Sequence, residues 1–280
     1  MQDETNILDE QSFEFIVALA YRESGLTLAP EKKRMVQSRL QHRLQALSLP
    51  DFGSYSALLQ SDRGVSERRK FISALTTNVS HFFREPHHFD LLSGEIISLY
   101  LPILRAGGRM RIWSAGCANG QEALSIAMSM LNRAPELSEL DVRILATDID
   151  PEVIAFAQNG FYPERMLNGV PKPMLDRYFT PISDDSALGF SASSWLKSMI
   201  SYKELNLLGS WPMRGSFDVI FCRNVVIYFD GPTQLRLWHR FHNLLSPDGI
   251  LLIGHSERIA GPEEFGFRAK SATCYERSQK

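Results

Sequence analysis

Residues 111–128 read RIWSAGCANGQEALSIAM, and this stretch decides the fold. A strand-like apolar run ends at Ala115, a turn with two glycines runs from Gly116 to Gly120, and a helical segment begins at Gln121. A strand, a glycine turn and a helix in this order are typical of the first unit of a doubly wound α/β sheet. The glycines allow a tight turn and let a ligand approach the main chain, although such a turn taken alone can also be purely structural.

The turn lacks the full dinucleotide fingerprint, because the glycine after Gly116 is Gly120 and an acid, Glu122, follows. It also lacks the Gly-Lys-Ser/Thr of a Walker phosphate loop. A carboxylate at this position would repel a pyrophosphate. We therefore expect a nucleoside ligand with little or no phosphate, and an NAD-dependent oxidoreductase is the less favoured alternative.

The sequence after about residue 110 alternates short apolar runs with helical segments. Runs such as 218–222 (DVIFC) and 250–254 (ILLIG) are typical of strands buried in a parallel sheet. The alternation predicts βαβ units with helices on both faces of the sheet. Residues 161–198, rich in Pro, Gly, Ser and aromatic residues, predict an inserted subdomain of two or three short strands. Residues 263–278 are expected to add one or two terminal strands, antiparallel at the edge.

Polar residues follow two further strands of this predicted sheet. Asp148 ends the run VRILATD, where an acid commonly accepts hydrogen bonds from ribose hydroxyls. The alternative is that Asp148 or Asp150 only caps the next helix. The run FDVIFC delivers three polar residues to the crevice outside the strand ends, where open α/β sheets bind ligands: Arg223, Asn224 and Tyr228.

The first 85 residues or so show helical periodicity and no strand pattern. The first helix is expected to begin with Ser12 as N-cap and to end at Gly25, and a second helix opens at Pro30. The second helix has a strongly basic face formed by Lys32, Lys33, Arg34, Arg39 and Arg43. This face is either a docking surface for an acidic partner or a solvated charged surface.

Residues 74–89, ALTTNVSHFFREPHHF, lie where the helical periodicity of the N-terminal part ends. Three polar residues are embedded there among aromatic ones: Asn78, Ser80 and Arg84. Arg84 could form a bidentate pair with a carboxylate, or could be a surface arginine on an interdomain linker. The neighbouring His-His pair has no further ligand cluster beside it in the sequence, so we predict no metal site.

The amino-acid composition excludes several classes of protein. The chain has 280 residues, 44% hydrophobic and 22% charged, with a net charge of −2, which excludes wholesale disorder and argues against a general nucleic-acid binder. Three cysteines without paired spacing predict reduced thiols, and no apolar run approaches the roughly 20 residues that span a bilayer. We expect a cytoplasmic monomer with no membrane insertion. Residues 22–70 carry ten basic and five acidic side chains, a local charge of +5 that favours an acidic protein partner.

Five motifs occur in order: TTNVSHFFRE (76–85), SAGCANGQE (114–122), ATDID (146–150), LNLL (205–208) and FCRNVVIYF (221–229). This set closely resembles the chemotaxis receptor methyltransferase family, which transfers a methyl group from S-adenosylmethionine to glutamate side chains of chemoreceptors. The resemblance covers nearly the whole chain. It implies an all-α N-terminal domain (1–80), a linker (81–95) and a Rossmann-like methyltransferase domain (96–280) with the β-subdomain inserted at about 161–198.

The resemblance also implies a site. The cofactor, S-adenosylmethionine, would leave as S-adenosylhomocysteine. Its binding residues would be Asn78, Ser80, Arg84, Gly116, Glu122, Asp148, Asn206, Leu207, Arg223 and Asn224, with Glu122 and Asp148 at the nucleoside end. Arg84 and Tyr228 would lie near the reacting methyl and the acceptor carboxylate. The partner would be the cytoplasmic helical bundle of chemoreceptors, docked on the basic helix, and a receptor C-terminal peptide could bind the β-subdomain.

The glycine loop departs from the family's usual GCSTGEEPYS, because Ala118 and Asn119 replace small hydroxyl residues and Gln121 replaces an acid. Glu122 is kept, and Ser80 keeps the hydroxyl of the usual threonine. These changes leave one alternative open: a catalytically weak, S-adenosylmethionine-binding regulatory module of a chemosensory pathway.

Overall fold

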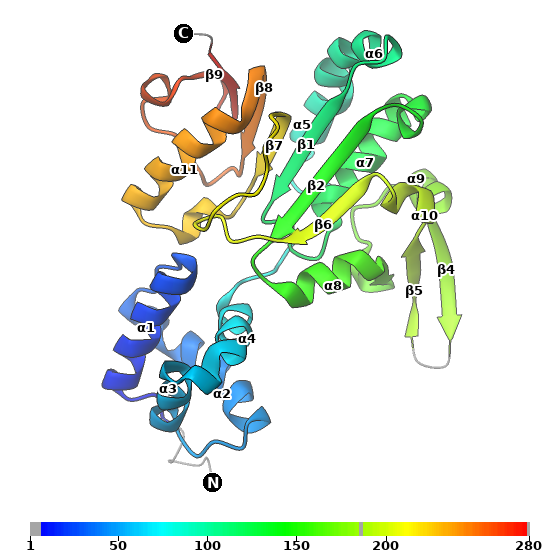
Figure 1. Ribbon diagram of the computed structural model, residues 1–280. Coiled ribbons are helices and arrows are strands. Elements are labelled where there is room, and N and C mark those ends of the chain that lie inside the picture. The colour runs from blue at the N-terminus through cyan, green and yellow to red at the C-terminus, as the bar shows by residue number, and fades with distance from the viewer. Residues whose placement is uncertain (1–6, 185–186, 279–280) are drawn as a thin grey trace.

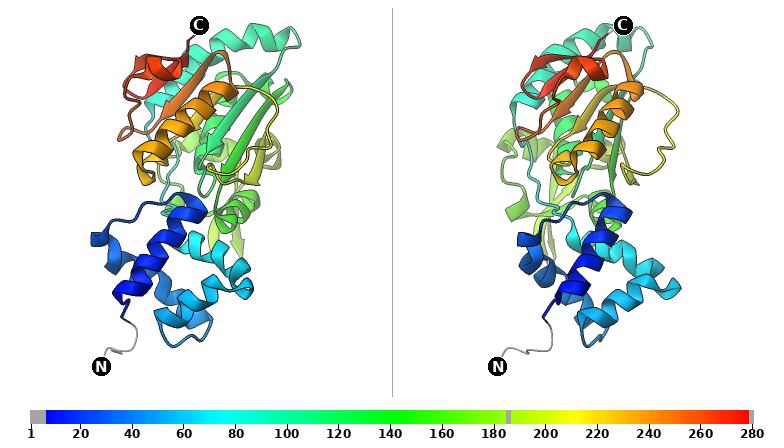
Figure 2. Two further views of the ribbon diagram at one scale, coloured as in Figure 1. Left: turned by 60° about the vertical axis from the view of Figure 1, so that its left-hand side comes forward. Right: turned by 90° about the vertical axis from the view of Figure 1, so that its left-hand side faces the viewer.

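A computed structural model describes residues 7–184 and 187–278 and places them in a helical domain and a sheet domain (Figures 1 and 2). The helical domain contains α1 (Glu10–Ser24), α2 (Lys33–Ala46), α3 (Phe52–Gln60) and α4 (Val65–Leu75). The four predicted helices are confirmed. Ser12 as N-cap is wrong: Asp9 caps α1 by accepting from the Ser12 N–H, and the Ser12 hydroxyl bonds back to the same carboxylate. Gly25 ends α1 in a left-handed conformation, as predicted.

The sheet domain is built on seven strands in the order β6-β2-β1-β7-β8-β10-β9. Five strands are parallel: β6 (Ile200–Glu204), β2 (Val142–Asp148), β1 (Met110–Ala115), β7 (Phe217–Cys222) and β8 (Leu245–Ile253). The terminal strands β9 (Phe267–Ser271) and β10 (Cys274–Arg277) run antiparallel at one edge. The predicted doubly wound sheet is therefore confirmed, with β6 as an additional edge strand.

Helices cover both faces of this sheet. One face packs against α5 (His87–Leu91), α6 (Ile97–Arg105), α7 (Gln121–Arg133) and α8 (Pro151–Asn159), and the other packs against α11 (Gly231–Leu244). Successive residues of β1 point to opposite faces, so that Ile112 joins the first core and Trp113 the second. Both side chains are fully buried.

The inserted segment forms a separate three-stranded antiparallel sheet in the order β3-β5-β4 (Figure 1). Its elements are β3 (Phe161–Pro163), α9 (Lys172–Tyr178), β4 (Phe179–Asp184), β5 (Ala187–Ala192) and α10 (Ser194–Lys197). The three short strands confirm the predicted subdomain. None of the helices in the described ranges is long and apolar enough to cross a bilayer.

The connection between the domains is shorter than the sequence predicts. Within the predicted linker, α5 begins at His87 and continues through a π-helical turn, Leu92–Ile96, into α6. Phe89 and Leu92 are buried in the core of the sheet domain. Residues 76–86 are thus the part of the chain between α4 and α5 without regular structure.

The two domains touch where α1 ends. The Thr27 N–H donates to the Tyr228 carbonyl at 2.9 Å, and the Tyr21 hydroxyl donates to Asp230 at 2.8 Å. Gly25 has a φ of 74°, which favours glycine, and a Cβ there would lie 2.2 Å from the Leu208 side chain, which would have to shift. The arrowheads of β1 and β2 point towards the helical domain, which places the glycine turn at the domain boundary (Figure 1).

Candidate functional site

A cavity of about 390 Å³ lies at this boundary, within the size range of small-molecule sites. Its wall combines the end of α1, the connection after α4 and the carboxyl ends of the parallel strands. All ten predicted cofactor residues line it, and so does Tyr228. Residues separated by up to 205 positions in the chain are brought into one cavity, since both Ser24 and Phe229 line it.

The glycine turn after β1 depends on the backbone conformation of Gly116. Gly116 has a φ of 83°, and a Cβ there would lie 2.3 Å from the Val225 side chain. The Gly116 and Cys117 N–H groups both donate to the Thr147 carbonyl, at 2.8 and 2.9 Å. Gly116 therefore allows β1 to turn directly beneath the loop that follows β7.

Glu122 lies in the first turn of α7 and is nearly buried. One carboxylate oxygen accepts from the Ser114 hydroxyl at 2.6 Å, and the other pairs with Arg223 at 3.0 Å. A carboxylate has about four acceptor positions, so these two contacts leave capacity for a ligand.

Asp148 and Asp150 have different tasks. Asp150 caps α8 by accepting from the Glu152 N–H at 2.9 Å, and it also accepts from the Asn78 side chain at 2.7 Å. Asp148 accepts from the Ala118 and Asp150 N–H groups and lines the cavity. Burial raises the pKa of Asp148 despite these donors. The helix cap is thus Asp150, and Asp148 is the acid that faces the cavity.

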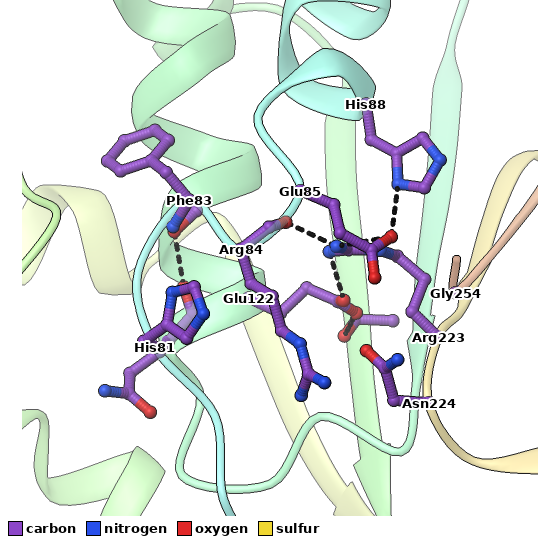
Figure 3. A network of polar contacts seen from close by, with 12 residues as sticks. His81, Phe83, Arg84, Glu85, His88, Glu122, Arg223, Asn224 and Gly254 are labelled. Carbon is purple, nitrogen blue, oxygen red and sulfur yellow. Dashed lines mark hydrogen bonds and ion pairs between the residues drawn. The ribbon is translucent and has the colours of Figure 1, made fainter. Parts of the chain in front are cut away.

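The loop that carries Arg84 is strained on both sides of it. Phe83 and Glu85 have φ values of 53° and 57°, which non-glycine residues rarely adopt. The Phe83 N–H is held by the Ser125 hydroxyl at 3.0 Å. The Arg84 side chain donates to the Val79 carbonyl at 3.3 Å and extends beside Asn224 in Figure 3. The backbone therefore aims the guanidinium into the cavity.

Arg223, which lines the cavity, makes several polar contacts with neighbouring protein groups (Figure 3). Its side chain is 1% exposed and lies over the Phe89 ring. It pairs with Glu122 at 3.0 Å and with Glu85 at 3.2 Å, and it donates to the Arg84 carbonyl. The predicted site residue thus contacts protein groups on three sides.

Glu257 supports the loop after β7, and no motif in the sequence points to this role. This buried carboxylate accepts N–H groups of Gly254 and of four consecutive residues of the loop, 224–227, at 2.6 to 3.4 Å. Asn224 in this loop has a φ of 58°. Burial raises the pKa of Glu257 although the N–H donors oppose the shift. The one available signal was an acid shortly after the last parallel strand.

Asn206 and Leu207, two of the predicted cofactor residues, lie on the loop after β6. The Asn206 side chain donates to the Glu23 carbonyl of α1 at 2.7 Å and so ties this loop to the helical domain. Arg240 of α11 donates to the Leu207 carbonyl at 2.5 Å and stacks over the Trp211 ring. The Leu207 backbone is therefore fixed from behind.

One group of side chains in the described residues has the spacing of metal ligands. Ligand atoms of Glu85, His87 and His88 lie within 4.8 Å of one another. The Glu85 carboxylate is already paired with Arg223 and His255. The buried guanidinium beside it would repel a cation, so the geometry gives no support to a metal site.

The basic helix α2 is partly neutralised within the domain. Arg43 forms a bidentate pair with Glu67, Arg39 donates to carbonyl groups at the end of α4, and Lys33 pairs with Glu10. Lys32 and Arg34 are exposed. The cationic surface available to a partner is therefore smaller than the sequence predicts.

Comparisons with known proteins agree with this arrangement. Residues 78–274 match the model of the CheR methyltransferase SAM-binding domain, and residues 11–76 match that of the CheR methyltransferase all-alpha domain. The chain is 43% identical over 262 residues to a probable chemotaxis protein methyltransferase of Rhizobium etli, covering 94% of this chain and 98% of that one. It is 39% identical over 272 residues to the chemotaxis protein methyltransferase of Escherichia coli, covering 96% and 91%.

Proposed function

The chain belongs to the CheR methyltransferase family, and from this membership and the cavity we propose that it methylates glutamate side chains of chemoreceptors. That it is an S-adenosylmethionine-dependent methyltransferase of chemotaxis follows from the family models and the relatives. The glutamate acceptor is the proposal. Its main support is the placement of Arg84, a carboxylate-binding side chain, in the same cavity as the predicted cofactor residues.

The cavity fits S-adenosylmethionine in chemistry. Glu122 and Asp148 retain acceptor capacity for the nucleoside end, and Gly116 lines the same cavity, where its lack of a Cβ lets the Val225 side chain pack against the turn. Asn206 and Leu207 would border the adenine. The other predicted cofactor residues would complete the site: Asn78, Ser80, Arg84, Arg223 and Asn224. When bound, the cofactor supplies a methyl group on a positively charged sulfonium.

The chain's own residues would position the acceptor. A glutamate carboxylate is ionised near neutral pH, since its ordinary pKa is about 4.3, so the reaction requires no strong general base. Arg84 would orient this carboxylate without binding it so tightly that it ceases to be a nucleophile. Tyr228 would donate a hydrogen bond near the reacting centre; its hydroxyl has no hydrogen bond to any of the described residues. Rate enhancement would come from positioning.

The proposed partner is the acidic helical bundle of a chemoreceptor. Lys32 and Arg34 are the exposed cations of α2 that would attract it. The β-subdomain would be the place for a receptor C-terminal peptide.

The decisive experiment uses S-adenosylmethionine labelled in the methyl group, with receptor-containing membranes as acceptor. Carboxyl methyl esters release labelled methanol in mild base, whereas N-methyl groups do not. We expect base-labile label on the receptor, lost with Arg84→Ala. Base-stable label would overturn the glutamate acceptor. Tight binding of S-adenosylhomocysteine without any label would instead support the regulatory-module alternative.

A further inference from the structure

Glu85 lies behind the site, outside the cavity lining, and its contacts converge on the site (Figure 3). Its side chain is 10% exposed and pairs at 3.2 Å with Arg223, which is 1% exposed. Arg223 pairs in turn with Glu122 at 3.0 Å. One buried guanidinium is therefore held between two carboxylates, of which only Glu122 reaches the cavity.

Glu85 is itself firmly held. Its second oxygen accepts from both the ring and the main-chain N–H of His255, at 2.7 and 3.2 Å. Burial alone would raise the pKa of Glu85, but the hydrogen bonds from His255 and the charge of Arg223 outweigh it and lower the pKa to about 2. The carboxylate is thus ionised and fixed throughout the physiological range.

The same guanidinium also fixes the main chain beside it. Arg223 donates to the Arg84 carbonyl, and Glu85, the next residue, occupies the left-handed region. Residues other than glycine rarely adopt this conformation, so contacts of the side chain must hold it. The Glu85–Arg223 pair provides such contacts on one side of Arg84.

We propose that Glu85 is a positioning residue that acts through Arg223. By fixing this guanidinium it holds the Glu122 carboxylate on the cofactor side of the cavity and the Arg84 main chain on the acceptor side. The inference rests on the proposed function for the roles of Glu122 and Arg84. One carboxylate outside the cavity thus sets the geometry of both halves of the site.

The test measures S-adenosylhomocysteine affinity by titration calorimetry, which needs no acceptor. Glu85→Gln keeps the size of the side chain and removes its charge. We expect about tenfold weaker binding and, with receptor substrate, a fall in kcat as well, because a small misplacement of positioning groups is costly. Glu85→Asp, which keeps the charge on a shorter side chain, should lie between Glu85→Gln and the unmodified protein.

A double-mutant cycle tests whether Glu85 affects S-adenosylhomocysteine binding through Arg223. If Glu85 acts through Arg223, adding Glu85→Gln to Arg223→Met should change the affinity less than twofold, since the two changes are coupled. Additive effects would overturn the proposal, as would an unchanged affinity in folded Glu85→Gln.

The matched control is Asp218→Asn, at the opposite end of β7 from Arg223. Asp218 accepts from Tyr100, the Arg111 N–H and Ser246, far from the cavity lining. It should lower thermal stability without weakening S-adenosylhomocysteine binding. Failure of receptor labelling in the unmodified protein would count against the proposed acceptor and would leave the calorimetric cycle fully readable.

Discussion

Several residues around the cavity adopt backbone conformations that cannot be predicted from the sequence. Phe83, Glu85, Ala118 and Asn224 all have positive φ, and none is a glycine. Strained backbone of this kind persists where surrounding contacts over-determine it, as they do at binding and catalytic sites. The sequence predicts the site residues at strand ends because parallel strands share an edge. It does not predict the supports, Glu85 and Glu257, because their role depends on tertiary contacts.

Replacement of Gly116 should lower both the stability of the protein and its ligand affinity. Gly116→Ala places a Cβ at a φ of 83° and against Val225, and it should cost about 1 to 3 kcal/mol of unfolding free energy. Binding of S-adenosylhomocysteine should weaken at the same time. Gly94→Ala is the control, because a Cβ there meets nothing within 4 Å and alanine is favoured over glycine in a helix. Equal urea midpoints for the two variants would contradict the argument.

His88 predicts a pH dependence of stability. Burial and the neighbouring charge of Arg223 lower the pKa of His88 to about 3, from an ordinary 6.5. Between these values the unfolded chain binds a proton that the folded chain does not, so stability falls as the pH is lowered from 6.5 towards 3, by up to about 1.4 kcal/mol per unit.

His88→Gln should flatten this dependence, measured by urea denaturation at several values between pH 4.5 and 6.5. Glu85, with a pKa of about 2 in the folded protein, adds to the slope only at the low end of this range, where the unfolded chain begins to bind a proton at this residue. A slope as steep as that of the unmodified protein would show that His88 is not the group responsible.

Helices and strands whose buried apolar residues recur at regular spacing can be predicted from the sequence. Those in which this spacing is interrupted cannot. The buried strands β1, β2, β7 and β8 read as apolar runs. The helices α5 and α6 were missed because the π-helical turn at Leu92–Ile96 shifts the spacing of their buried residues, and Pro102 lies inside α6. The edge strand β6 has the sequence ISYKE, with only two of its five residues buried, so it lacks a continuous apolar run.

The helix α11 supports the loop that we propose borders the adenine, because Arg240 donates to the Leu207 and Gly209 carbonyls. Arg240→Met keeps much of the stacking on Trp211 and removes both charged hydrogen bonds, each worth about 1.5 to 3 kcal/mol at most. We expect a three- to tenfold rise in the KM for S-adenosylmethionine with kcat nearly unchanged.

The control for this change lies one turn earlier on the same helix. Arg236→Met removes an exposed arginine whose side chain donates to Thr233 of its own helix. It should leave both constants unchanged. A loss of kcat in Arg240→Met that matches the rise in KM would point to general misfolding rather than to a displaced Leu207.

At the scale of the whole molecule, charge is distributed unevenly, and the structure decides which cations a partner can meet. The net charge of −2 conceals the +5 of residues 22–70. Arg39 and Arg43 are engaged within the helical domain, so reversing them would test folding rather than docking. The sequence could predict the cationic surface but not this internal use of it.

Reversal of Lys32 and Arg34 to Glu should reduce kcat/KM for receptor methylation roughly tenfold at low ionic strength, because steering of an acidic partner is lost. The difference should shrink at 0.5 M salt, a condition chosen because salt screens such interactions. S-adenosylhomocysteine binding should be unaffected. Reversal of Arg109 and Arg214, exposed on the sheet domain, is the control; equal losses for both pairs would remove the case for docking on α2.

The contact between α1 and the loop after β6 has a consequence for recombination between relatives. Gly25 lies where any side chain would collide with Leu208, and Asn206 reaches the last turn of α1. Because both domains contribute residues to the cavity wall, we expect the two domains to be inherited together and not to be exchangeable between relatives. A chimera that joins the helical half of one relative to the sheet half of another should retain cofactor affinity only when these facing positions are transplanted together.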